Sequence, residues 1–172
     1  MLARLQQSLI FGTLLLAAAW CGLVWALDWP RGWALVGLLS PIVAHAGLLA
    51  MEFVLLAVVS DSAPAPRPGT SQLIRAWWRE VRASVAVFAW RQPFRSQREP
   101  DDVDPQRHAG RCGVVLVHGF VCNRGLWTPW LARLRRRGTP FVAVNLEPVF
   151  GAIEAYVPLI DAAVQRLEQA TG

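Results

Sequence analysis

Residues 113–120 read GVVLVHGF, a short apolar run rich in β-branched side chains that ends in a His-Gly pair. Runs of this kind are typical of a strand that is buried on both faces of a parallel sheet. A second run of the same character, FVAVNL, follows at 141–146. Because parallel strands need a crossover connection, a helix between the two runs would favour parallel pairing.

Helix signals follow each of the two predicted strands. Thr128 suits the N-cap position, Pro129 suits the first helical position, and Gly138 follows a basic last turn. The apolar stripe of this helix consists of Trp130, Leu131 and Leu134. The second helix has Pro158 near its start, and its stripe is made of Ile153, Tyr156, Val157, Ile160, Val164 and Leu167. The strand-helix-strand-helix order predicts an α/β fold with helices on both faces of a parallel sheet.

The segments VVLVHGFVCNRGLW (114–127) and FVAVNLEPVFGAIEAYVPLIDAAVQRL (141–167) resemble the front of bacterial lipases and esterases with the α/β-hydrolase fold. The resemblance covers about residues 113–172. It implies a partial α/β-hydrolase parallel sheet and cleavage of carboxylic esters, lipid esters above all. The alternative is another doubly wound domain, in which His118 is only a turn residue.

The same resemblance assigns roles to three consecutive residues. In the family, the strand that ends in His-Gly supplies a backbone N–H to the oxyanion hole, from the residue after the glycine. Carried over to this chain, that residue is Phe120, while Gly119 allows a close approach of the backbone and His118 orients the loop. A fixed N–H aimed at the developing negative oxygen can lower the barrier by about 3 kcal/mol.

The chain departs from the family in lacking a catalytic triad. No serine follows Ser96 and no histidine follows His118, so the nucleophile, the acid and the base are absent. In the family these groups come after the His-Gly strand. We therefore expect an N-terminal fragment that is inactive alone. Cys122 is a weak alternative nucleophile, because the only nearby imidazole is His118 and no third group orients it.

The first third of the chain predicts two transmembrane helices. Residues 8–27 hold no charge and reach the roughly 20 residues needed to cross a bilayer. A second apolar run, 33–59, is interrupted by Pro41, His45 and Glu52. The polar turn between the runs is flanked by tryptophans, which predicts a hairpin with its turn at the headgroup level. A cleaved signal peptide is the alternative for the first run.

Charged residues around the two runs predict an orientation. Arg67, Arg75 and Arg79 follow the second run, so the positive-inside rule places the downstream chain in the cytoplasm. The resemblance to bacterial enzymes implies that the membrane is the inner one. His45 and Glu52 lie two helical turns apart on one face. They are candidates for a proton or ion pathway, but contacts with the partner helix and the interface are the simpler explanation.

Four segments are expected: a hairpin at 1–60, a Pro-rich linker at 61–70, an amphipathic helix with a polar surface loop at 71–111, and a truncated hydrolase domain at 112–172. The apolar stripe of the third segment consists of Ile74, Trp77, Trp78, Val81, Val85 and Phe88. Such a stripe either lies on anionic lipid or packs on the hydrolase domain, and the periodicity does not choose between them.

Composition argues against several classes of partner and cofactor. The formal charge is +5 and all 17 basic residues are arginines, but they are scattered and no base-stacking motif accompanies them, so no nucleic-acid partner is expected. The three cysteines form no CxxC pair, and we predict no disulfide, metal or cofactor. The predicted function is a membrane-anchored serine hydrolase whose partners are the lipid bilayer and an ester or lipid substrate. The alternative is a non-catalytic membrane-bound interaction module.

Overall fold

The structure, a computed structural model, describes residues 1–59 and 68–172 in two compact units. The sheet unit consists of Met1–Ser8 and Val87–Gly172, and the hairpin unit is Leu9–Ala86. Most of the linker expected at 61–70 lies outside the described residues. Each unit is described by itself.

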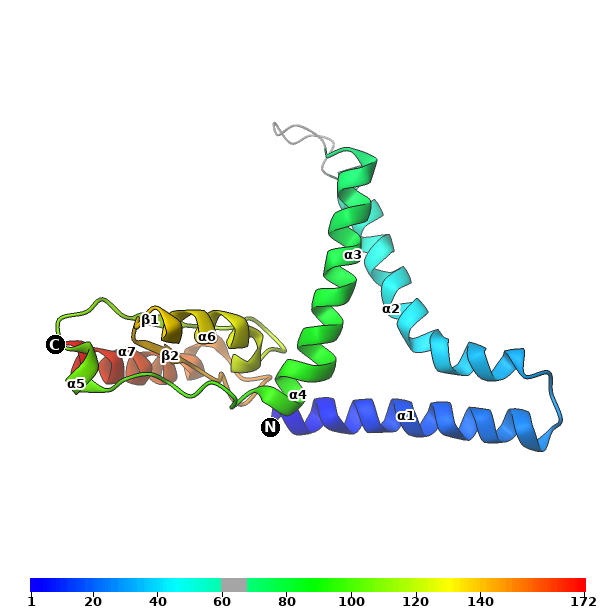
Figure 1. Ribbon diagram of the computed structural model, residues 1–172, viewed down its shortest axis with the longest axis horizontal. Helices are drawn as coiled ribbons and strands as arrows, with labels where there is room; N and C mark the ends of the chain where they lie inside the picture. The colour runs from blue at the N-terminus through cyan, green and yellow to red at the C-terminus, as the bar shows by residue number, and fades with distance from the viewer. Residues whose placement is uncertain (60–67) are drawn as a thin grey trace. The chain divides into compact units, whose positions relative to one another are not determined.

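Two long helices begin the chain, α1 (Leu2–Ala26) and α2 (Gly32–Val59) (Figure 1). Both are long and apolar enough to cross a membrane, and only 6% and 0% of their most apolar windows are buried. A helix that is apolar all round and exposes its side chains is suited to lipid rather than water. The structure thus contains two N-terminal helices that are compatible with membrane insertion.

Tryptophans hold the turn between these helices. The indole N–H of Trp20 donates to the carbonyl of Trp33 at 2.7 Å, and the Trp29 ring lies 6.1 Å from that of Trp20 and 6.3 Å from that of Trp33. Gly37 allows this arrangement, because a Cβ there would lie 2.1 Å from the Trp20 ring. The aromatic cluster therefore fastens α1 to α2 close to their connection.

The second half of α2 packs against α3 (Thr70–Ala86). Figure 1 shows a bend in α2, and Pro41, inside the helix, removes one backbone hydrogen bond and so accounts for it. The indole N–H of Trp77 donates to the carbonyl of Ala46 at 2.9 Å, while Val81 and Ser84 are buried. The amphipathic stripe of α3 thus has a partner, α2, that its periodicity could not name.

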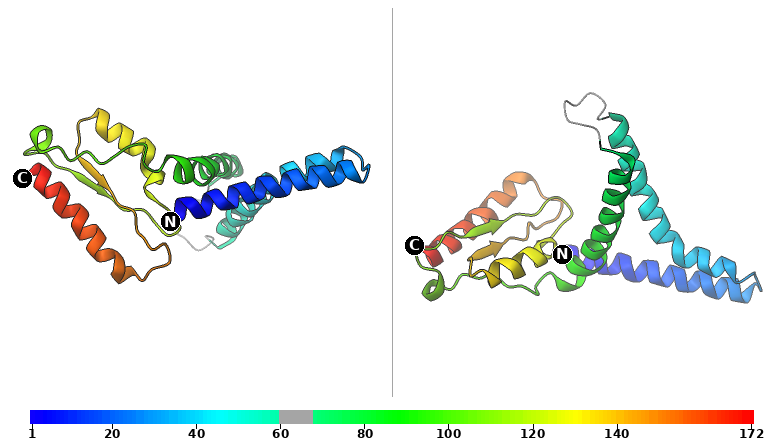
Figure 2. Two further views of the ribbon diagram at one scale, coloured as in Figure 1. Left: turned by 90° about the horizontal axis from the view of Figure 1, so that it is seen from below. Right: turned by 45° about the horizontal axis from the view of Figure 1, so that its top comes forward.

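The sheet unit continues with a π-helical turn, η2 (Val87–Arg91), and α4 (Gln92–Arg95), α5 (Pro105–His108), β1 (Val114–Leu116), η3 (Arg124–Trp127), α6 (Thr128–Arg136), β2 (Phe141–Ala143), η4 (Ile153–Tyr156) and α7 (Val157–Thr171). The strands are parallel, with Val115 opposite Val142. Helices α6 and α7 cover opposite faces of this pair (Figure 2). One core cluster consists of Leu131, Phe141 and Ala143, and the other of Val142, Val144, Ala163 and Leu167.

The fold class predicted from the resemblance, a partial α/β-hydrolase parallel sheet, is wrong. The chain is 70% helical, and its described residues contain one sheet of two three-residue strands. Each predicted strand is shorter than its apolar run, because a ladder with one partner orders only the residues that face that partner. The runs 113–120 and 141–146 therefore end in loops after Leu116 and Ala143.

The start of the first crossover helix also differs from the prediction. Thr128 is the first residue of α6 rather than its N-cap, because the 3₁₀ turn η3 runs directly into the helix. The cap is Asn123, whose side chain accepts from the N–H of Gly125 at 2.8 Å. At the other end Gly138 has a positive φ of 65°, as expected for a glycine that ends a helix.

The polar loop expected on the surface at 95–111 is partly buried. Asp102 and His108 are each 3% exposed, and the imidazole Nε2 lies 2.9 Å from the carboxylate. Asp102 also forms an antiparallel bridge with Phe141, exchanging N–H···O bonds of 3.0 and 3.1 Å. The segment thus covers the outer edge of β2, which would otherwise expose unpaired backbone groups.

The first two turns of α1 belong to the sheet unit. Leu2 is 1% exposed, the Gln6 side-chain amide donates to that of Gln92 at 2.8 Å, and the Gln7 amide donates to the Pro93 carbonyl at 2.7 Å. No pattern in the sequence indicates this packing. The residues just before the predicted transmembrane helix at 8–27 therefore help to stabilise the sheet unit.

Candidate functional site

The loop that follows β1 holds the three residues singled out by the resemblance. His118 is buried, at 5% exposure, whereas Phe120 is 76% exposed and its ring lies edge-on to that of Phe150 at 5.7 Å. Among the described residues no acceptor is bonded to the N–H of Phe120. The loop therefore leaves a main-chain donor available at the carboxyl end of a parallel strand.

His118 ties this loop to the end of β2. Its Nε2 accepts from the Leu146 N–H at 3.0 Å, and its Nδ1 lies 2.9 Å from the Gly119 carbonyl oxygen. Since Nε2 accepts, the proton of a neutral ring is placed on Nδ1, which donates to Gly119. The geometry is that of a residue that orients the loop.

The sharp turn in this loop is at Val121 rather than Gly119. Val121 has a φ of 54°, which is rare for a β-branched residue, whereas Gly119 is outside that range. A Cβ on Gly119 would meet nothing within 4 Å, so no protein contact requires glycine there. The open space beside Gly119 is available to another molecule.

A small pocket lies against the loop. It encloses about 30 Å³ and is lined by His118, Gly119, Phe120, Val121, Cys122, Leu146, Val149 and Tyr156. That volume admits a water molecule or a single oxygen-bearing group. The Tyr156 hydroxyl is occupied, since it donates to the Pro148 carbonyl at 2.6 Å and accepts from the Gly151 N–H at 3.0 Å. The Tyr156 hydroxyl is therefore not free to bind an occupant of the pocket.

Cys122 has no base beside it. Both ring nitrogens of His118 are engaged with main-chain atoms of Gly119 and Leu146, so this imidazole has no free nitrogen to take a proton from the thiol. Activation of a thiol needs such a base or a lowered pKa. The geometry gives no support to Cys122 as a nucleophile.

Burial lowers the pKa of His118 below its ordinary value of 6.5, although the hydrogen bond to Gly119 and the nearby Glu147 carboxylate act in the opposite direction. The unfolded chain then binds a proton more readily than the folded one. The contribution of His118 to the free energy of unfolding should be fully present above about pH 6.5. It should be lost as the pH falls through the pKa that His118 has in the folded chain.

We expect the free energy of unfolding of the sheet unit to fall between pH 7.5 and 5, and to fall less in His118→Gln. Urea titrations across this range measure both curves. The difference between the two curves isolates His118 from the other titrating groups. Curves that stay parallel would mean that His118 titrates alike in the folded and unfolded chain.

The histidine of the hairpin unit, His45, also has a close side-chain partner. His45 Nε2 lies 2.7 Å from the hydroxyl of the buried Ser84 on α3, and that hydroxyl is 3.1 Å from the Val81 carbonyl. The partner expected for His45 was the first apolar helix, but the structure supplies α3. Spacing along the chain could not indicate a pair that is 39 residues apart. A serine beside a histidine is the arrangement of a serine nucleophile and its base, but such a nucleophile also needs free N–H groups for the oxyanion. Ser84 lies inside a regular helix, where the neighbouring N–H groups are used in helical hydrogen bonds.

No metal-ligand group of three or more His, Cys, Asp or Glu side chains occurs among the described residues. The chain matches no family model, and it matches neither a curated protein nor a solved structure.

Proposed function

We propose that this chain is the membrane-anchored, oxyanion-binding part of a serine hydrolase that cleaves carboxylic esters, with lipid esters as the preferred class. The observation that carries the proposal is the Phe120 loop. It follows a parallel strand, its N–H has no acceptor among the described residues, and it borders open space beside Gly119.

The chemistry of ester cleavage explains why such a donor matters. Attack on an ester converts the carbonyl oxygen into an oxyanion, and a preoriented N–H stabilises that charge without reorganising when the reaction occurs. His118 supplies the preorientation, since its ring bonds both to the loop and to the Leu146 N–H. The side chain of residue 120 takes no part in this interaction.

The residues that would complete the reaction are not in this sequence. No serine follows Ser96, and both nitrogens of His118 are engaged. The proposal therefore requires a nucleophile, an acid and a base from a different polypeptide segment. The proposal assigns this chain two tasks, attachment to the bilayer and stabilisation of the oxyanion.

The proposed location is the inner membrane of a bacterium, with the sheet unit in the cytoplasm. Helices α1 and α2 supply two segments suited to lipid. The arginines after α2 favour a cytoplasmic position for the chain that follows. Lipid esters in the adjacent leaflet would then be the nearest substrates.

The test asks whether the same gene encodes a longer product and, if it does, uses that product. We expect the present chain to remain unlabelled by a serine-directed fluorophosphonate, and a longer product that contains a G-x-S-x-G segment to be labelled and to hydrolyse p-nitrophenyl butyrate. In that longer protein, Phe120→Pro removes the N–H and should reduce kcat by about 10²–10³. Phe120→Ala keeps the N–H and should leave kcat almost unchanged.

Two outcomes would contradict the proposal. Equal rates in the Phe120→Pro and Phe120→Ala proteins, both shown to be folded by circular dichroism, would remove the oxyanion role. A gene whose longer products carry no nucleophile and hydrolyse no ester would favour the alternative, a non-catalytic membrane-bound interaction module.

A further inference from the structure

Four exposed apolar side chains lie at one end of the sheet unit. Phe120, Phe150, Ile153 and Val157 are 76%, 66%, 79% and 52% exposed. The loops that carry the two phenylalanines line one pocket together, and η4 and α7 begin with Ile153 and Val157. We call these four residues the apolar patch. A group of exposed apolar side chains on a folded unit marks a surface that contacts another protein or a membrane.

Charge is sparse in the chain that forms this patch. Residues 148–160, PVFGAIEAYVPLI, contain one charged side chain, that of Glu154. Glu154 is exposed, so its carboxylate can remain among polar groups while its neighbours contact hydrocarbon. The patch therefore offers a partner almost nothing but apolar contact.

The start of α1 lies at the same end of the sheet unit as the apolar patch. The main-chain nitrogen of Met1 lies 2.6 Å from the carboxylate of Glu147, just before the Phe150 loop. The Gln6 amide donates to Gln92, whose carbonyl accepts from Asn123 at 3.1 Å, just after the Phe120 loop. Figure 2 shows the N-terminus at the end of the sheet unit toward which both strands run, and the C-terminus at the opposite end.

The first turns of α1 indicate where the headgroups of a membrane would lie. Arg4 is exposed, and it is the only charged side chain in residues 1–27. The uncharged run begins at Ser8, about 6 Å beyond Arg4 at 1.5 Å per residue. An arginine at the end of a membrane-spanning helix places its guanidinium among the headgroups. Met1 lies only about 5 Å from Arg4 along the helix, so the end of the sheet unit that holds Met1 lies at headgroup level as well.

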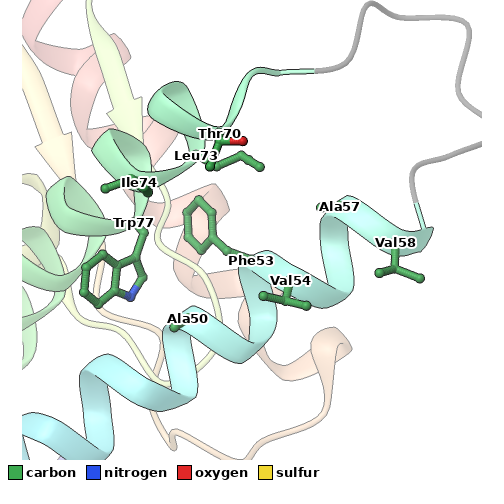
Figure 3. A pocket seen from close by; sticks show the side chains of 9 residues that line it. All are labelled: Ala50, Phe53, Val54, Ala57, Val58, Thr70, Leu73, Ile74 and Trp77. Carbon is green, nitrogen blue, oxygen red and sulfur yellow. The ribbon is translucent and has the colours of Figure 1, made fainter.

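The hairpin unit has an apolar hollow of a different kind, a groove of about 360 Å³ between α2 and α3. Figure 3 shows the Phe53 ring and the Trp77 indole between the two helices. None of the residues that line the groove is charged, and one wall is α2, which is itself suited to lipid. The groove therefore continues the apolar surface of α2. The apolar patch differs, because it belongs to a unit with polar surfaces and a core of its own.

We propose that the apolar patch inserts into the surface of the membrane that α1 enters, so that the Phe120 loop opens onto lipid. The membrane is the partner because α1 reaches it less than two turns from the residues that contact the Phe120 and Phe150 loops. Exposed Phe and aliphatic side chains are also those that enter the boundary between headgroups and acyl chains. The inference rests on the membrane attachment in the proposed function and is independent of ester cleavage.

The experiment is fluorescence quenching by lipid in proteoliposomes. The full chain carries Cys21→Ala, Cys112→Ala and Cys122→Ala, together with Ile153→Cys labelled with the fluorophore NBD. The vesicles are phosphatidylcholine, with or without a nitroxide near the start of one acyl chain. Because a nitroxide quenches only fluorophores close to it, we expect the label at residue 153 to lose most of its fluorescence.

The matched control places the same label at Gln169, an exposed residue at the other end of α7, about 18 Å beyond Val157 along the helix. This label should keep its fluorescence. Phe150→Asp should remove most of the loss at residue 153. Val164→Asp should leave the loss unchanged, since Val164 is an exposed apolar residue of α7 outside the patch.

Equal quenching at residues 153 and 169, or none at residue 153, would overturn the inference. A second copy or another protein bound to the patch would give the second result, because it would shield the label from lipid. Release of the chain from the vesicles by alkaline carbonate would overturn the inference together with the membrane attachment. Absence of ester hydrolysis by a longer product would contradict the proposed enzyme while the quenching at residue 153 remained.

Discussion

Phe141→Ala is expected to destabilise the sheet unit by about 3–5 kcal/mol, the range for removing a buried aromatic ring. Phe141 is completely buried at the first position of β2, where it packs with Leu131 and Ala143. Its ring also lies 5.3 Å from the Arg135 guanidinium. Because small domains are stable by only about 5–15 kcal/mol, this single change would remove a large share of the stability of the unit.

Pulse proteolysis in a urea series measures this effect on the sheet unit while α1 and α2 remain in detergent. The matched control is Phe120→Ala, the same chemical change at a ring that is 76% exposed, and it should alter the free energy of unfolding by less than about 0.5 kcal/mol. Similar losses in both variants would show that the α6 face of β2 is not the core of this unit.

Asp101→Ala is expected to cost about 3–5 kcal/mol, because it leaves a buried cation without its carboxylate. Asp101 accepts from the Arg124 Nη2 at 2.8 Å, and both side chains are almost fully buried, at 12% and 9% exposure. The same carboxylate accepts from the Ala143 N–H at 3.1 Å, on the outer edge of β2. The variant therefore loses an ion pair and a strand-edge hydrogen bond together.

The control for Asp101 removes an exposed partner of the same carboxylate. Arg166 also donates to Asp101, at 3.0 Å, but its side chain is 53% exposed, so Arg166→Gln should cost less than about 1 kcal/mol. Urea midpoints of the two variants provide the comparison. A loss in Arg166→Gln as large as that in Asp101→Ala would mean that the exposed pair, rather than the buried Arg124 pair, stabilises this corner.

The parallel strand pair could be predicted from local sequence, since two apolar β-branched runs separated by helix signals are a short-range pattern. The extent of the sheet could not be predicted in this way. The number of strands depends on which segments find partners, and the resemblance implied partners that the described residues do not supply. The burial of Asp102 could not be predicted for a related reason: a polar loop becomes buried only when it packs against the edge of another element.

At the candidate site, the pattern at 118–120 predicted a loop after a strand, and the structure contains that loop. The pattern did not predict its geometry, in which His118 bridges two main-chain groups. The positive φ lies at Val121, where composition alone would have favoured glycine. The His45–Ser84 pair and the groove beside it arise from packing between α2 and α3, so no spacing rule along the chain could reveal them.

The docking of Leu2, Gln6 and Gln7 against the residues around Gln92 limits how this protein can be prepared. A version made by deleting everything before Val87 would remove the contacts that Gln6 and Gln7 make with Gln92 and Pro93. A purification tag fused ahead of Met1 would lie close to the same contacts. A better design would keep residues 1–8 and rejoin them to the later segment through a synthetic linker in place of the long apolar helices.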